Sequence, residues 1–142
     1  MNHCPFGTLF TAIQEKIQTE VREIRFIEQD FGQLEEINPP VTFPCVLIDF
    51  NSWNYEDIGE NVQLATGNVQ IRIGFQAYST TNQLTPVYFR DKALSYYDIE
   101  NKIYKALQGW KPNQYSYLTR NSAATEPKED NCPQAVLLQE RP

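Results

Sequence analysis

The spacing of hydrophobic residues predicts two helices in this chain. Apolar residues three and four positions apart form one helical stripe that begins after Thr8, with Thr8 as the N-cap and Gly7 just outside the helix. The members of this stripe are Leu9, Ile13, Ile17, Val21 and Ile24. The same period recurs over residues 90–110 and predicts a second helix, with Asp91 in its first turn and Gly109 near its end.

Strand patterns occupy the remaining apolar segments. Residues 24–27 suit a short strand, and the compact apolar run 45–50 has the length of another. Residues 68–78 alternate strictly, so that one side of the strand is apolar and the other mixed. Gly67 lies either in a tight turn before this strand or at a bulge in one long ribbon that starts near Leu64. Two further strands, 115–121 and 134–140, close the chain.

The order helix, three strands, helix, two strands predicts an α+β fold. We expect a mainly antiparallel β-sheet with the two helices packed on one face. The length of 142 residues fits one domain, 1–142, with residues 1–7 flexible and residues 121–133 forming a loop. The apolar side of residues 68–78 is expected to pack beneath the helices.

Charge and cysteine content narrow the classes of function. A net charge of −6 opposes the attraction to phosphate that dominates nucleic-acid binding. The three cysteines, Cys4, Cys45 and Cys132, form neither a disulfide framework nor a CxxC pair, so we expect reduced thiols and folding in the cytosol. The first ten residues do not have the pattern of a signal peptide and no apolar run approaches eighteen residues, so we expect neither export by a classical signal nor a membrane span.

Candidate catalytic and metal-binding residues are sparse. His3 is the one histidine and lies beside Cys4 near the N-terminus, where it is poorly placed for a zinc site or for a Ser-His or Cys-His couple. The glycines are isolated, so no phosphate-binding loop is present. The sequence therefore predicts no catalytic residue, no metal, no cofactor and no enzymatic activity.

Three sets of residues are candidates for contacts instead. Glu56, Asp57 and Glu60 lie in a polar, turn-rich run that matches no calcium loop and is expected to form a solvated acidic loop. Trp53 and Tyr55 in the same run are either interface anchors or core residues. The polar side of the alternating strand is expected to meet another subunit or to line a passage; its members are Gln70, Arg72, Gln76 and Tyr78.

The order of these elements resembles the tail terminator, or tail-completion, proteins of long-tailed bacteriophages, over about residues 9–138. The resemblance lies in the N-terminal amphipathic helix, the proline-bounded strand "FPCVLIDF", the long strand and loop "NVQIRIGFQAYSTT", the helix "DKALSYYDIENKIYKAL" and the two closing strands. It rests on order, size and hydrophobic pattern, and no diagnostic residue string is involved.

The resemblance implies a structural virion protein, located in the tail or neck and assembled in the host cytoplasm. Such a protein forms a ring, typically of six copies, that caps the tail tube and joins it to the head. Its partners are then further copies of itself, the tail-tube protein and a head-completion or connector protein, while DNA passes through without specific binding. The acidic loop could then face the lumen, since a negative wall repels phosphate. Two alternatives are another neck or tail-tube subunit of the same architecture and a small cytosolic protein-binding or adaptor domain.

Overall fold

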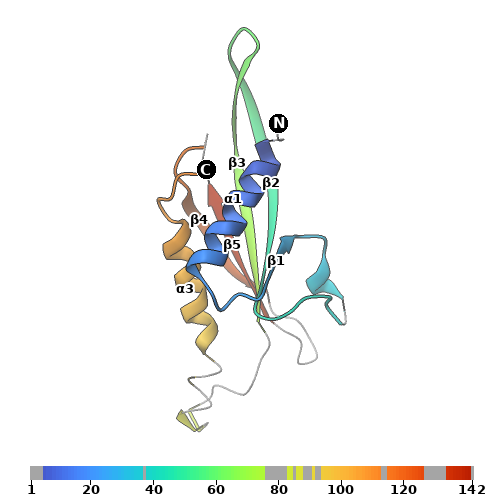
Figure 1. The fold of residues 1–142 in the computed structure, drawn as a ribbon, viewed down its shortest axis with the longest axis vertical. Helices are drawn as coiled ribbons and strands as arrows, with labels where there is room; N and C mark the ends of the chain where they lie inside the picture. Colours follow the sequence, from blue (N-terminus) through green and yellow to red (C-terminus); the bar gives the residue numbers. More distant parts are fainter. Residues whose placement is uncertain are drawn as a thin grey trace.

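A computed structural model describes residues 5–36, 38–75, 83–84, 86–87, 91, 94–112, 115–126 and 134–141 of the protein. Within them, two helices lie against a five-stranded sheet (Figure 1). The elements in chain order are α1 (Pro5–Glu20), β1 (Phe26–Gln29), the short 3-10 helix η1 (Gln33–Glu35), β2 (Cys45–Gly59), β3 (Val62–Phe75), α3 (Ser95–Leu107), β4 (Thr119–Glu126) and β5 (Gln134–Arg141). No helix among these residues is long and apolar enough to cross a membrane.

The strands lie in the order β1-β2-β3-β5-β4. Every neighbouring pair is antiparallel except β1 and β2, which are parallel. The last strand in the sequence, β5, therefore lies between β3 and β4. This architecture confirms the predicted α+β fold, including the order of helices and strands.

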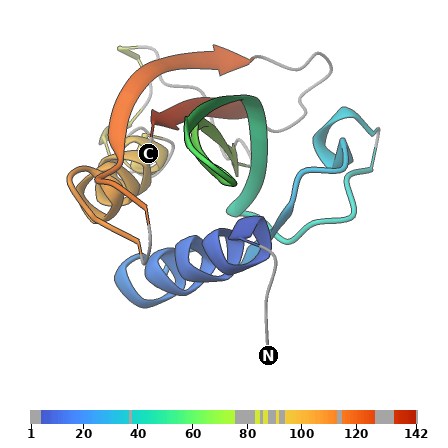
Figure 2. The ribbon, with the colours of Figure 1, turned by 90° about the horizontal axis from the view of Figure 1, so that it is seen from above.

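The main core lies between the helices and one face of the sheet. Both helices lie on the same side of the curved sheet in Figure 2. The sheet contributes Val46, Ile48, Val69, Ile71, Ile73 and Phe75, and the helices contribute Leu9, Ile13, Ile17, Ile99, Ile103 and Leu107. The predicted apolar side of the alternating strand, from Val69 to Phe75, thus packs where it was expected.

The opposite face of the sheet is covered by the segment between β1 and β2. Cys45 and Leu47 point to this face and form a second apolar cluster with Leu34, flanked by Phe26, Val41 and Phe43. Because successive residues of a strand point to opposite faces, both sides of β2 are covered here. Burial on both faces explains why residues 45–48 are continuously apolar and not alternating.

Several predicted boundaries were wrong. Helix α1 begins at Pro5 and not after Thr8, because proline is well tolerated in the first turn of a helix. Strand β4 continues to Glu126, so residues 121–126 form a strand and not part of a loop. Pairing with β5 stabilises this polar strand, whose side-chain pattern alone does not predict it. Residues 1–4 and 127–133 lie outside the described residues.

The largest difference concerns residues 51–61, which were expected to form a polar loop. They belong instead to β2 and to the turn that joins it to β3, and the two strands form one long hairpin. The ladder starts at Cys45 and Gly74 and ends at Gly59 and Val62. The half of this hairpin near the turn extends well beyond the rest of the molecule (Figure 1).

Candidate functional site

The projecting part of the β2–β3 hairpin is the feature of the structure that the core does not explain. We call residues 54–66 the arm. Every residue of the arm is exposed, whereas Gly67, next in β3, is buried. Its cross-strand pairs run from Asn54 opposite Thr66 to Gly59 opposite Val62, and Glu60 and Asn61 make the turn. A two-stranded ribbon without a supporting layer is only marginally stable in water.

Both edges of the arm are open within the described part of the chain. Strand β1 pairs with β2 only over Cys45–Ile48. Strand β5 pairs with β3 only over Val69–Phe75, so the backbone of residues 62–68 has a neighbour on the β2 side alone. Unpaired backbone donors and acceptors of this kind favour the addition of another strand.

Exposed apolar side chains cover much of the arm. Tyr55 is 56% exposed, Ile58 61%, Val62 51% and Leu64 50%. Val62 and Leu64 share one face of the ribbon, whereas Tyr55 lies on the other face, because Glu56 and not Tyr55 is opposite Leu64. Both faces of the arm therefore expose apolar side chains, as protein interaction sites do.

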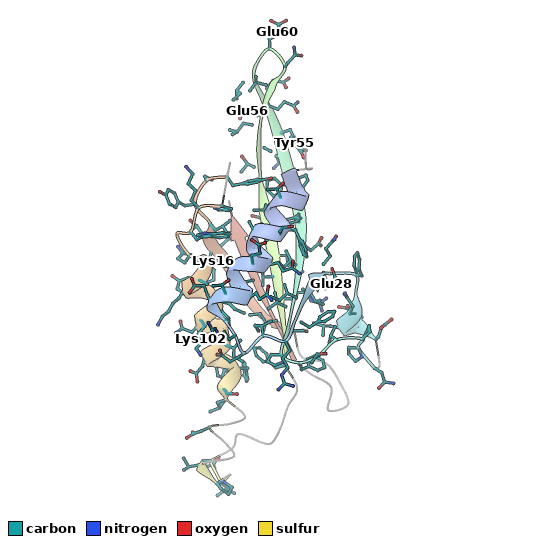
Figure 3. All side chains as sticks on the ribbon, viewed as in Figure 1. Lys16, Glu28, Tyr55, Glu56, Glu60 and Lys102 are labelled. Carbon is teal, nitrogen blue, oxygen red and sulfur yellow. The ribbon has the colours of Figure 1, made fainter. Side chains whose placement is uncertain are left out.

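The predicted acidic residues lie on the same arm. Glu60 is at the turn, and Glu56 lies on the ribbon close to Tyr55 (Figure 3). Asp57 accepts a hydrogen bond from Nε2 of Gln63, its cross-strand partner, at 2.9 Å. The structure therefore places Glu56, Asp57, Glu60 and Tyr55 together, on strands and a turn and not in the loop that the sequence suggested.

Trp53 marks the point where the arm leaves the body. The strand register places both Ser52 and Trp53 opposite the single residue Gly67, which is a β-bulge, and Ser52 has a φ of 57°. Of the two alternatives for Gly67, the structure confirms the long ribbon and excludes the tight turn, but the extra residue of the bulge lies on β2, opposite Gly67.

The indole ring of Trp53 lies directly over Gly67. A Cβ atom at position 67 would lie 2.3 Å from Cδ2 of Trp53, so only glycine leaves room for the ring. The ring also packs edge-on against Phe6 of α1 and against Tyr115, with centroid distances of 5.0 and 6.4 Å. Its Nε1 is buried with no hydrogen-bond partner among the described residues. Packing therefore holds the ring, and Trp53 anchors the arm to the body.

Arg72 belongs to the third candidate set, the polar side of the alternating strand, and its position corrects the prediction. It was expected on an exposed face that meets another subunit, but it is 7% exposed. Its Nη1 lies 3.2 Å from Oδ2 of Asp30, and its Nη2 lies 2.7 Å from Oε1 of Glu35. The guanidinium therefore ties the segment after β1 to the back of the sheet within one chain.

The same pairs determine the protonation of Arg72. Burial lowers the pKa of the guanidinium, but hydrogen bonds and charge interactions with Glu35 and Asp30 outweigh this effect and raise the pKa. The residue stays charged at any pH at which the protein folds. A permanently charged, buried guanidinium is stable only with carboxylate partners. The alternating pattern of β3 could not predict these partners, because both come from another segment of the chain.

Of the other members of this set, the structure describes only Gln70. Gln70 is half-buried and accepts a hydrogen bond from Nδ2 of Asn51 at 2.7 Å. Gln76 and Tyr78 lie outside the described residues. The structure thus supports the arm, and not the polar side of β3 in the body, as the exposed surface.

The described residues offer little for catalysis or metal binding. No group of three or more His, Cys, Asp or Glu side chains among them is arranged to hold a metal ion. Burial raises the pKa of the Cys45 thiol to about 11, which keeps it protonated and a poor nucleophile at neutral pH. His3, Cys4 and Cys132 lie outside this part of the chain.

Comparisons with known proteins agree with the fold. No family model and no curated protein matches the sequence. Among solved structures, the chain is similar to a chain from the virion of a native gene transfer agent particle, with 13% sequence identity and a TM-score of 0.58. The similarity covers 99% of this chain and 96% of that one. At this identity it shows that the two chains share a fold over nearly their whole length.

We expect Gly67→Ala to loosen the attachment of the arm. The added methyl group overlaps the Trp53 ring, so the ring must move, at a cost of about 1–3 kcal/mol in the free energy of unfolding. Denaturant unfolding, monitored by tryptophan fluorescence, measures the loss. Gly59→Ala is the control, because a Cβ there meets only the Cβ of Val62 at 3.9 Å. Equal stability of the two variants would show that the Trp53 contact does not hold the arm.

We expect Arg72→Met to destabilise the protein by about 3–5 kcal/mol, because it leaves the carboxylate of Asp30, only 10% exposed, buried without its cation. Lys16→Met removes the same charge from the exposed pair with Glu20 and should cost less than about 1 kcal/mol. Urea titrations of both variants measure the difference. Similar midpoints for the two would mean that the buried pair of Arg72 with Asp30 contributes no more than a surface pair.

Proposed function

We propose that this protein is a structural subunit of the virion of a long-tailed phage or phage-like particle. Within that class, we propose the role of a tail terminator, a ring that caps the tail tube and joins it to the head. The observation that carries the proposal is the fold shared with a virion chain along nearly the full length of both. The order of elements in the sequence, which resembles that family, supports the same role.

The arm supports an assembly role on independent grounds. An enzyme or a small-molecule binding protein needs a concave site with convergent polar groups. Here four exposed apolar residues lie on a projecting ribbon with open strand edges. Such a ribbon suits contacts between protein subunits, and contacts between unlike patches on identical subunits generate closed rings.

The role of the arm within a ring would follow from its position. Trp53 and the core half of β2 and β3 fix the base of the arm to the body, so it projects in a defined direction. We infer that the body forms the ring while the arm makes contacts with a neighbour, the tail-tube protein or the head-completion protein. DNA would pass through the ring without specific binding, in keeping with the net charge of −6.

Inactivation of the gene in the phage or particle that encodes this chain tests the proposal. A missing terminator should leave tails of uncontrolled length that carry no heads, visible by electron microscopy. Expression of the intact chain in trans should restore joined particles of uniform tail length. Headless tails of normal length would point instead to another neck subunit, the first alternative. Normal, complete particles would contradict a virion role and favour the adaptor alternative.

A further inference from the structure

We propose that the arm of one copy docks on the region where α3 ends and β4 begins in the next copy. This inference deepens the proposed function and rests on it. The partner that the arm contacts is thus a second copy of this chain. Three features of the chain support this contact: the separation of charge along the sequence, two lysines without an ion pair, and the open strand edges.

Opposite charges are separated into two stretches of the sequence. Residues 45–71 include four acidic residues and no basic one: Asp49, Glu56, Asp57 and Glu60. Residues 101–123 include four basic residues and no acidic one: Lys102, Lys105, Lys111 and Arg120. The first stretch forms the arm and its base, and the second forms the end of α3 and the start of β4.

These stretches cannot neutralise each other within one molecule. Glu60 lies at the end of the arm, while Lys102 lies on α3 at the far side of the body (Figure 3). The arm projects away from α3 because its base is fixed by Trp53 and the core. Complementary charges that are held apart in one copy can meet only between copies.

The basic stretch is held together where α3 meets the segment before β4, although Glu15 and Glu20 of α1 line the same surface hollow as Lys111. Backbone hydrogen bonds from Gly109 to Leu118 and from Leu118 to Trp110 join the end of α3 to the segment before β4. Two of its cations already have partners, since Lys102 contacts Glu23 and Arg120 lies 3.7 Å from Glu100.

Lys105 and Lys111 remain available for the arm. Both are exposed and form no ion pair within the described part of the chain. The half-buried Trp110 lines the same surface hollow as Lys111, with Lys16 5.7 Å from the centroid of its ring, and Tyr117 in the same stretch is 63% exposed. Lysines and aromatic side chains are complementary to the arm, because the arm exposes carboxylates together with the apolar residues Tyr55, Ile58 and Leu64.

Strand edges allow the contact to include backbone hydrogen bonds. Both register shifts between β2 and β3 involve extra residues on β2, between Asn51 and Asn54 and between Asp57 and Gly59. The edge of β3 over residues 62–68 is therefore regular, and it includes no charged residue. Charges and bulges are the usual devices that protect an edge from pairing, and this edge lacks both.

The strand edge that would pair with the arm of another copy is the outer edge of β4. Among the described residues β4 pairs only with β5, which leaves its outer side open. The arm edge and the β4 edge are different patches, so each copy can offer one and accept the other. Such a contact is heterologous, and it generates a ring when the rotation between successive copies closes.

Charge reversal tests the inference. The arm variant, Glu56→Lys with Glu60→Lys, and the acceptor variant, Lys105→Glu with Lys111→Glu, each place like charges in contact. We expect each to raise the Kd of self-association at least about tenfold, measured by sedimentation velocity. A chain with all four substitutions restores the opposite charges and should recover most of the affinity. Glu28→Lys with Glu36→Lys is the control, because it changes the net charge by the same amount as the arm variant but at positions away from both surfaces. This control should self-associate like the unaltered protein.

Three results would overturn the inference. One is self-association of the arm variant equal to that of the control, and another is failure of the fourfold variant to recover. A third is an unaltered chain that stays monomeric at the highest accessible concentration. None of these contradicts the proposed virion role, which the gene inactivation tests separately. Slower DNA ejection by particles with the arm variant, without any loss of ring assembly, would place the acidic residues in the lumen instead.

Discussion

The ladder between β2 and β3 is the interaction on which the rest of this structure depends. Its first half is buried, with the helices on one face and the segment after β1 on the other. Its second half continues the same backbone pairing without either layer. Because the two halves share one ladder, the stability of the core half supports a ribbon that could not fold alone. Trp53, seated over Gly67, lies where the two halves meet.

This division separates the residues that maintain the fold from those that are free for contacts. Arg72 illustrates the first group, because its pairs with Asp30 and Glu35 fasten the covering segment to the back of the sheet. Glu56, Glu60 and Tyr55 illustrate the second, because they contribute nothing to the core. The second group comprises the residues on which the proposed assembly role relies.

The sequence predicted the helices, the sheet and the buried side of β3, because hydrophobic periodicity reports directly which face is covered. It did not predict the arm. A ribbon exposed on both faces has no hydrophobic alternation, so residues 51–61 look like a loop although cross-strand hydrogen bonds make them a strand. The role of Arg72 was missed for a related reason. Alternation shows which side of a strand a residue lies on, but not whether a distant segment covers that side with carboxylates.

Hydrogen exchange of the arm backbone is the measurement that tests the central claim most directly. In the isolated protein, amides of Val62 to Asn68 should exchange much faster than those of Ile71 and Ile73, which lie in the buried half of the same strand. In the assembled particle or ring, the arm amides should become protected, because a second copy covers them. Arm amides that remain as exposed after assembly as before it would contradict the account.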